Sequence, residues 1–171
     1  MAKPLIKPLY QAALRMTRQR EWAEDLVQDT LIRAYERIEL FKAGTNFRAW
    51  LFTILTNTYL NDCERGRRRP LTTSFDVMGV NGSIWEFPAT EENDPVFVLM
   101  AHVLEDQLQS ALDALSDEFR LAVLLVDIEE MSYQEAADAL SVPIGTIRSR
   151  VSRGRFQIRQ YLGKQSEIEM H

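Results

Sequence analysis

Cysteine and histidine are nearly missing from this sequence of 171 residues, which has one cysteine, Cys63, and two histidines. A single cysteine excludes an internal disulfide, and these residues are too few for a zinc site of Cys and His ligands. His102 and His171 are isolated, and neither a nucleophile–His–acid set nor a glycine-rich phosphate loop is present. We therefore expect no enzyme, no metal site and no cofactor.

Long hydrophobic runs are also missing. The longest apolar stretches are only a few residues long, as in Leu121–Val126, whereas a helix that crosses a bilayer needs about 20 apolar residues. The first seven residues include bases, but no apolar segment follows them as it would in a signal peptide. These features predict a cytoplasmic protein without membrane insertion.

Acidic residues are absent from residues 141–160, "SVPIGTIRSRVSRGRFQIRQ", which carry five arginines although the chain has a formal net charge of -5. Residues 1–70 hold thirteen bases and eight acids, and residues 71–95 hold five acids and no base. Residues 96–143 hold ten acids and one base, and residues 144–171 hold six bases and two acids. Two basic regions separated by acidic material indicate local attraction to a polyanion. The same division would allow a free form in which residues 96–143 face the basic first region, although the sequence leaves the placement of the two regions open.

Apolar residues recur three or four positions apart in two parts of the chain, which predicts an all-α fold of two small helical domains. The first domain comprises residues 1–69, with a break at Gly44 and a further helix from about Phe47. Residues 70–95 contain three prolines and two glycines, and we expect an irregular linker there before the second domain, residues 96–171. The apolar positions of the first domain are Leu9, Ala12, Ala13, Met16, Leu26, Val27, Leu31, Ala34, Tyr35, Ile38, Trp50, Leu51, Ile54, Leu55 and Leu60.

The second domain contains the signals of a helix-turn-helix. Ser116 is placed to cap one helix, and "SYQE" at residues 132–135 has the pattern of a capping box for a short second helix. Pro143 suits the first turn of a third helix, because its missing N–H is tolerated there.

A helical wheel of the third helix separates an apolar seam from a polar face. The seam comprises Ile144, Ile147, Val151 and Ile158, and the polar face with its flanks comprises Thr146, Arg148, Ser149, Arg150, Ser152 and Arg153. Arginine can pair with guanine, and hydroxyls and guanidiniums can bind phosphates, so the face suits a major groove. The alternative is a solvated surface helix, although such helices usually alternate their charge signs. Phe156 also points away from the seam, and the pattern does not explain it.

The first domain offers a second polar surface. Asn57 and Asn61 are followed by Arg65 and by the arginines 67–69. Amides beside bases suit recognition of nucleobase edges, and Tyr59 could stack on an unpaired base. Taken singly, such residues are more often ordinary surface or core residues.

Three stretches together carry a family pattern. "AEDLVQDTLIRAYERI" and "FRAWLFTILTN" resemble conserved region 2, and "MSYQEAADALSVPIGTIRSRVSRGR" resembles region 4, of the extracytoplasmic-function (ECF) sigma factors of bacteria. The resemblance covers essentially residues 9–160. It implies an alternative sigma factor that binds core RNA polymerase and promoter DNA and is restrained by an anti-sigma factor. Relatives often have glycine in place of Ser141, which implies a left-handed backbone at that turn.

The resemblance implies roles for both regions. The second helix of region 2 docks on the largest polymerase subunit, which implies Asp25, Leu26, Gln28, Asp29 and Arg33. The next loop and helix open and hold the −10 promoter element, which implies Lys42, Gly44, Thr45, Asn46, Asn57, Asn61, Arg65, Arg67 and Arg68. The last helix of region 4 enters the major groove of the −35 element, which implies Thr146, Arg148, Ser149, Arg150, Ser152 and Arg153. The apolar concave side of region 4 grips the second-largest subunit.

The linker of relatives runs toward the active-site cleft of the polymerase. The acidic residues of the linker here would suit that path, although a spacer that merely avoids DNA would be acidic too; they are Asp76, Glu86, Glu91, Glu92 and Asp94.

Other interpretations remain open. A sigma-mimicking domain that sequesters an anti-sigma factor is expected to lose the bases of its third helix, which this chain keeps. A stand-alone helix-turn-helix repressor needs a dimer interface and does not need region 2. Cys63 is either a regulatory thiol, favoured as thiolate by Arg65, or a plain half-buried cysteine.

Overall fold

The computed structural model describes residues 3–66 and 106–169, with side chains from residue 4 and as far as residue 164. The first part contains a short 3-10 turn (Lys3–Leu5), α1 (Ile6–Thr17), α2 (Arg20–Glu36), a second 3-10 turn (Ile38–Leu40) and α3 (Phe47–Glu64). The second contains helical residues 106–113, α5 (Asp117–Val123), a π-helical turn (Leu124–Ile128), α6 (Tyr133–Leu140) and α7 (Ile144–Glu169). No strand occurs in these two parts, and the expected all-α fold is confirmed. The expected linker, with its five acidic residues, lies outside the described residues.

The first module, residues 3–66, is a bundle in which α1 packs on α2 and α2 packs on α3. The expected apolar positions of α1 are all buried, and so are most of those of α3. Two apolar positions of the helical period, Tyr35 and Ile38, do not belong to the core, because they are 82% and 48% exposed. Ala34 rather than Tyr35 faces the core, and α2 ends at Glu36, so the helical period no longer places Ile38.

The second module, residues 106–169, contains the expected helix-turn-helix in α6 and α7. The capping box is present: the Glu135 N–H donates to Ser132 Oγ (3.2 Å), and the Ser132 N–H donates to Glu135 Oε2 (2.8 Å). Ser141 has the expected left-handed backbone, with φ of 53°. Ser116 does precede α5, but its side chain makes no capping hydrogen bond, contrary to expectation.

The π-helical turn after α5 was not foreseen. Its ladder includes a bond from the Glu129 N–H to the Leu124 carbonyl, five residues back, at 2.9 Å. Because a wheel assumes 3.6 residues per turn, an inserted residue of this kind is invisible to it.

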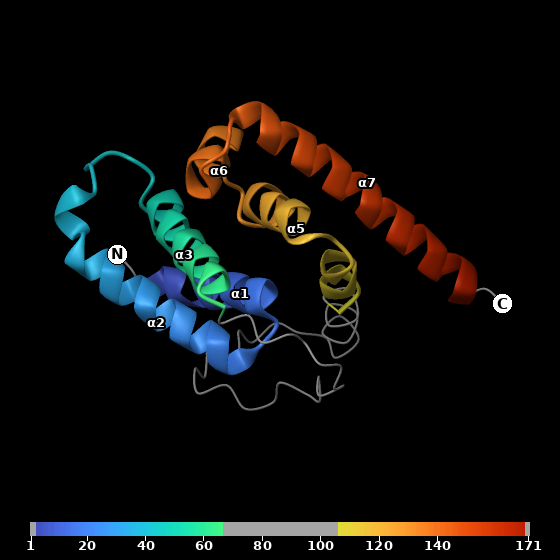
Figure 1. Cartoon of the computed structure of the whole chain (residues 1–171), viewed down its shortest axis with the longest axis horizontal. Coiled ribbons are helices and arrows are strands. Elements are labelled where there is room, and N and C mark those ends of the chain that lie inside the picture. Colours follow the sequence, from blue (N-terminus) through green and yellow to red (C-terminus); the bar gives the residue numbers. More distant parts are fainter. Residues whose placement is uncertain (1–2, 67–105, 170–171) are drawn as a thin grey trace, which may run out of the picture.

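The two modules are in contact. α3 packs against α6, and buried side chains of both modules belong to one hydrophobic core. In Figure 1, α6 lies beside α3, and α7 runs outward across the far side of α5. Within the described helices, none is long and apolar enough to cross a membrane.

Gly154 allows α7 to approach α5 closely. A Cβ atom at this position would lie 2.5 Å from Cγ2 of Val123. Valine is stiff because its side chain is branched at Cβ, so the contact could be relieved only by a shift of a helix.

We expect Gly154→Ala to lower the free energy of unfolding by about 1–3 kcal/mol, the usual cost of overpacking a core. Gly163→Ala is the matched control, because Gly163 is also in α7 and has open space around it. That change should stabilise the helix by about 0.5–1 kcal/mol. Urea unfolding of the two variants measures the difference, and equal effects would contradict the close approach.

Candidate nucleic-acid interface

The predicted polar face of α7 is exposed. Ile147 and Val151 are buried against the rest of the second module, which turns the opposite side of the helix to solvent. Arg148, Ser149, Ser152 and Arg153 are exposed, and Thr146 and Arg150 are partly exposed. We call these six residues the basic face.

The arginines of α7 differ in their partners. Arg150 pairs with Glu118 (Nη2–Oε2, 3.0 Å), and Arg155 bonds Asp127 (Nε–Oδ2, 3.0 Å). That hydrogen bond, together with the charge of Asp127, raises the pKa of Arg155. Arg148 and Arg153 form no ion pair with any residue that the structure describes. These two guanidiniums are therefore the ones on the basic face that are ready to bind an external anion.

A second polar surface lies along α3. Asn57, Asn61 and Arg65 are exposed and follow one another four residues apart, so they form a row on one side of the helix end. Arg67 and Arg68 lie outside the described residues. Tyr59 is only 3% exposed and stacks on Trp22 with ring centroids 5.6 Å apart, so it is not available to stack on a base.

The loop before α3 is exposed over Lys42, Gly44, Thr45 and Asn46. Gly44 has φ of 90°, which a residue with a side chain rarely adopts. Asn46 caps α3, because its Oδ1 accepts from the Ala49 N–H at 3.2 Å. The Asn46 amide also donates to Glu135 Oε1 of α6 at 3.0 Å, so this loop touches the second module.

The residues implied for polymerase docking lie on α2. Asp25 and Gln28 are exposed, Asp29 and Arg33 are partly buried, and Leu26 is 1% exposed in the core. Sequence reasoning missed a neighbouring set of exposed apolar side chains, which we call the apolar patch. The patch comprises Ile32, Tyr35, Ile38 and Leu40.

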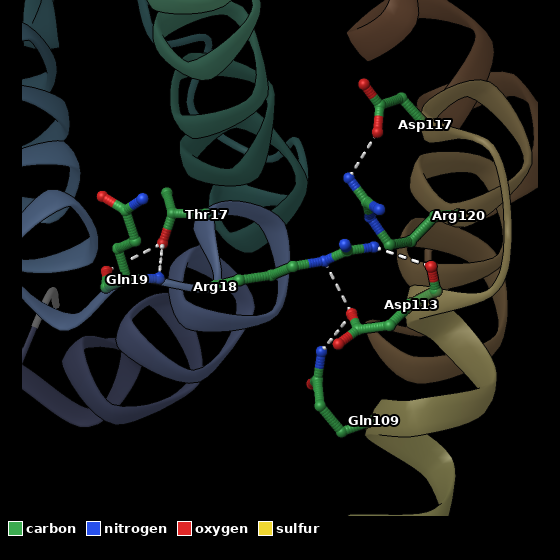
Figure 2. A network of polar contacts seen from close by, with 7 residues as sticks. All are labelled: Thr17, Arg18, Gln19, Gln109, Asp113, Asp117 and Arg120. Carbon is green, nitrogen blue, oxygen red and sulfur yellow. Dashed lines mark hydrogen bonds and ion pairs between the residues drawn. The ribbon is translucent and has the colours of Figure 1, made fainter. Parts of the chain in front are cut away.

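Ion pairs join the two modules. Arg48 Nη2 lies 2.7 Å from Glu129 Oε2, and the Glu129 side chain is only 4% exposed. Figure 2 shows Arg18 reaching from the end of α1 to Asp113, with Nε 2.7 Å from Oδ1 and Nη2 donating to the carbonyl oxygen at 3.0 Å. Next to this pair, Arg120 binds Asp117. In both inter-module pairs, a base of the first module faces an acid of residues 96–143.

The pKa of the Glu129 carboxyl is shifted by its surroundings. Burial raises its pKa above the ordinary value of 4.5, although Arg48 acts in the opposite direction. A raised pKa in the folded state means that folding favours the protonated acid. The stability contributed by this group is therefore full below about pH 4.5 and is lost as the pH rises through the folded pKa.

We expect Glu129→Gln to remove this pH dependence, because glutamine keeps the shape and an acceptor for Arg48. The difference in unfolding midpoint, variant minus wild type, should increase as the pH is raised from about 4.5 toward neutrality, through the raised pKa of Glu129. A difference that stays constant over this range would show that the environment does not disfavour the Glu129 charge.

Comparison with known proteins finds family models and relatives that match this chain. Residues 1–69 match Sigma-70 region 2, and residues 105–157 match Sigma-70 region 4. The chain is 41% identical over 159 residues to the ECF RNA polymerase sigma factor SigE of Mycolicibacterium smegmatis, covering 92% of this chain and 58% of that protein. It is 36% identical to the ECF RNA polymerase sigma factor EcfG of Rhodopseudomonas palustris, covering 85% of this chain and 74% of that one.

Solved structures are similar as well. The sigma factor RpoE of Bartonella quintana, in complex with the anti-sigma factor NepR, superimposes with a TM-score of 0.68 and 31% identity, covering 95% of this chain and 94% of that one. CnrH, in complex with the cytosolic domain of CnrY, shares the fold with a TM-score of 0.64 at 24% identity, over 95% of this chain and 85% of CnrH.

Proposed function

Because this chain belongs to the ECF sigma factors of RNA polymerase, we propose that it binds core RNA polymerase and directs initiation at promoters whose −35 and −10 elements it reads. The observation that carries this proposal is the basic face of α7, on which Arg148 and Arg153 are exposed without an acidic partner among the described residues. In this role the chain acts in the cytoplasm and catalyses no reaction of its own, because the polymerase makes the RNA.

The basic face would lie in the major groove of the −35 element. Arginine presents two donors that match the O6 and N7 acceptors of guanine, and serine hydroxyls can bind either bases or phosphates. Arg148 and Arg153 are then the base-reading residues, with Thr146, Ser149, Arg150 and Ser152 placing the helix on the backbone.

The row on α3 would hold the opened −10 element. Asn57 and Asn61 offer amides for the edge of an extruded base, and Arg65, with Arg67 and Arg68 beyond it, offers charge for the phosphates. The exposed loop of Lys42, Gly44, Thr45 and Asn46 lies before the same helix. Such contacts would offset the few kcal/mol that unstacking a base costs.

Docking on the largest polymerase subunit would use the exposed side of α2. Asp25, Gln28, Asp29 and Arg33 supply polar contacts, the apolar patch supplies area that is now exposed to water, and Leu26 supports the helix from the core. The concave side of the second module would grip the second-largest subunit.

The closed form of the chain cannot place its two polar surfaces on both promoter elements at once. The names −35 and −10 give a separation of about 25 base pairs. At about 3.4 Å per base pair, this is about 85 Å of duplex. Modules that share one hydrophobic core cannot reach both elements, so the chain must open on the polymerase.

An anti-sigma factor, such as the one bound to RpoE of Bartonella quintana, would restrain the free chain.

Transcription by purified core polymerase tests the proposal. With the chain added, genomic fragments should yield transcripts from discrete start sites that core polymerase alone does not use. Binding of an anti-sigma factor without any transcript would support a sigma-mimicking regulator instead.

A further inference from the structure

Phe156 lies on the solvent-exposed side of α7. Its side chain is 56% exposed although it is a large apolar group. Within the described residues its ring contacts no other aromatic ring and no arginine. A contact with a partner could remove the apolar surface of this ring from water.

The position of Phe156 relative to the basic face is regular. It lies nine positions after the buried Ile147, and at about 100° per residue this places it about 180° from Ile147 around the helix. Ser149, Ser152, Arg153 and Phe156 stand at positions i, i+3, i+4 and i+7, which form one row on the exposed side of the helix. All four are exposed.

This spacing is that of a helix that reads bases. In homeodomains, the four positions of the third helix that read the major groove have the same i, i+3, i+4, i+7 spacing. The row spans about 10 Å along the helix axis, at about 1.5 Å per residue. Helical side chains lean toward the N-terminus, so the ring of Phe156 covers the turn that holds Ser152 and Arg153.

The charge around Phe156 favours DNA over a protein partner. No aspartate or glutamate occurs between residues 141 and 160, and Arg153 and Arg159 stand three positions before and three positions after Phe156. The only apolar group that a base pair presents in the major groove is the 5-methyl group of thymine, and phenylalanine is among the residues that contact it.

We propose that Phe156 packs against the methyl group of a thymine in the −35 element and specifies that base. This inference rests on the proposed function, because it assumes that the basic face lies in the groove. Phe156 then adds a base contact one helical turn beyond that of Arg153, and its partner is the duplex rather than a protein.

The test begins with selection of −35 sequences from a randomised promoter library by holoenzyme containing wild-type chain, Phe156→Ala or Arg159→Ala. We expect one thymine preference to disappear in Phe156→Ala alone. Arg159→Ala, a neighbouring exposed residue, should weaken binding to all sequences equally. Circular dichroism confirms that each variant is folded.

A methyl deletion then isolates the contact. Replacing the selected thymine by deoxyuridine removes only the methyl group and should weaken wild-type holoenzyme about three- to fivefold, the effect of burying one such group. The same replacement should leave Phe156→Ala unaffected. Equal thymine preference in both proteins, or loss of polymerase binding without a change of preference, overturns the proposal. If wild-type holoenzyme selects no −35 sequence at all, the proposed function itself is wrong.

Discussion

Holoenzyme containing Arg148→Ala or Arg153→Ala should bind its −35 element about 1–3 kcal/mol more weakly, a loss of roughly five- to 150-fold. The reason is the unpaired state of both guanidiniums in the free chain: neither has to give up an ion pair with a described residue to bind DNA. Base preference should relax at the position that each arginine reads. Binding curves on a selected promoter and its single-base variants measure both effects.

Two control variants separate base reading from simple attraction. Arg148→Lys keeps the charge but loses the planar pair of donors, so it should relax the base preference and keep the dependence on salt. Arg155→Ala removes an arginine that bonds Asp127, so it should leave base preference unchanged. If the alanine variants at 148 and 153 keep wild-type preference, this helix does not read the groove.

Arg48→Ala should open the free chain. The variant leaves the buried carboxylate of Glu129 without its partner at 2.7 Å, and separation of the modules would return that carboxylate to water. Leaving a buried polar group unsatisfied costs about 1–3 kcal/mol, so the ratio of open to closed chain should rise roughly five- to 150-fold. The single native cysteine makes this measurable, because Cys63→Ser frees the chain for labelling at chosen positions.

Fluorescence transfer between dyes at Glu21→Cys in α2 and Gln134→Cys in α6 reports the separation of the modules. We expect high transfer in the free wild type, lower transfer in Arg48→Ala, and low transfer in the promoter complex of either. Arg20→Ala is the matched control, because Arg20 pairs with Glu24 inside α2 at 2.9 Å and should have no effect on opening. Low transfer in the free wild type would show that the closed form does not persist in solution.

Local signals in the sequence predicted the helices well. The capping box at Ser132 and Glu135 depends on residues only a few positions apart, so a short pattern could reveal it, whereas the left-handed Ser141 was implied by the resemblance. The buried seam of α7 followed from the helical period at Ile147 and Val151. Gly154, on the same seam, was a signal that the prediction overlooked.

Contacts between residues that are far apart in the sequence explain the features that the sequence patterns did not predict. Tyr59 has a hydroxyl that would suit a surface position. Its ring stacks on Trp22, and burial raises the pKa of its hydroxyl, so this residue belongs to the core. Arg48 and Glu129 are 81 positions apart, and only the opposite charges of the two regions hinted at their pairing. Some of the residues chosen for DNA and polymerase binding are exposed, such as Asn57, Arg148 and Asp25, whereas Leu26 is buried. The roles of all of them stay predictions.

The most direct test of the account is transcription from one selected template in which the −35 element, the −10 element or both are replaced. A chain that reads two elements with two separate surfaces should lose most initiation when either element is replaced, and the loss at the −35 element should disappear in an Arg148→Ala, Arg153→Ala double variant. Initiation by the wild-type holoenzyme that persists undiminished after either replacement would contradict the account.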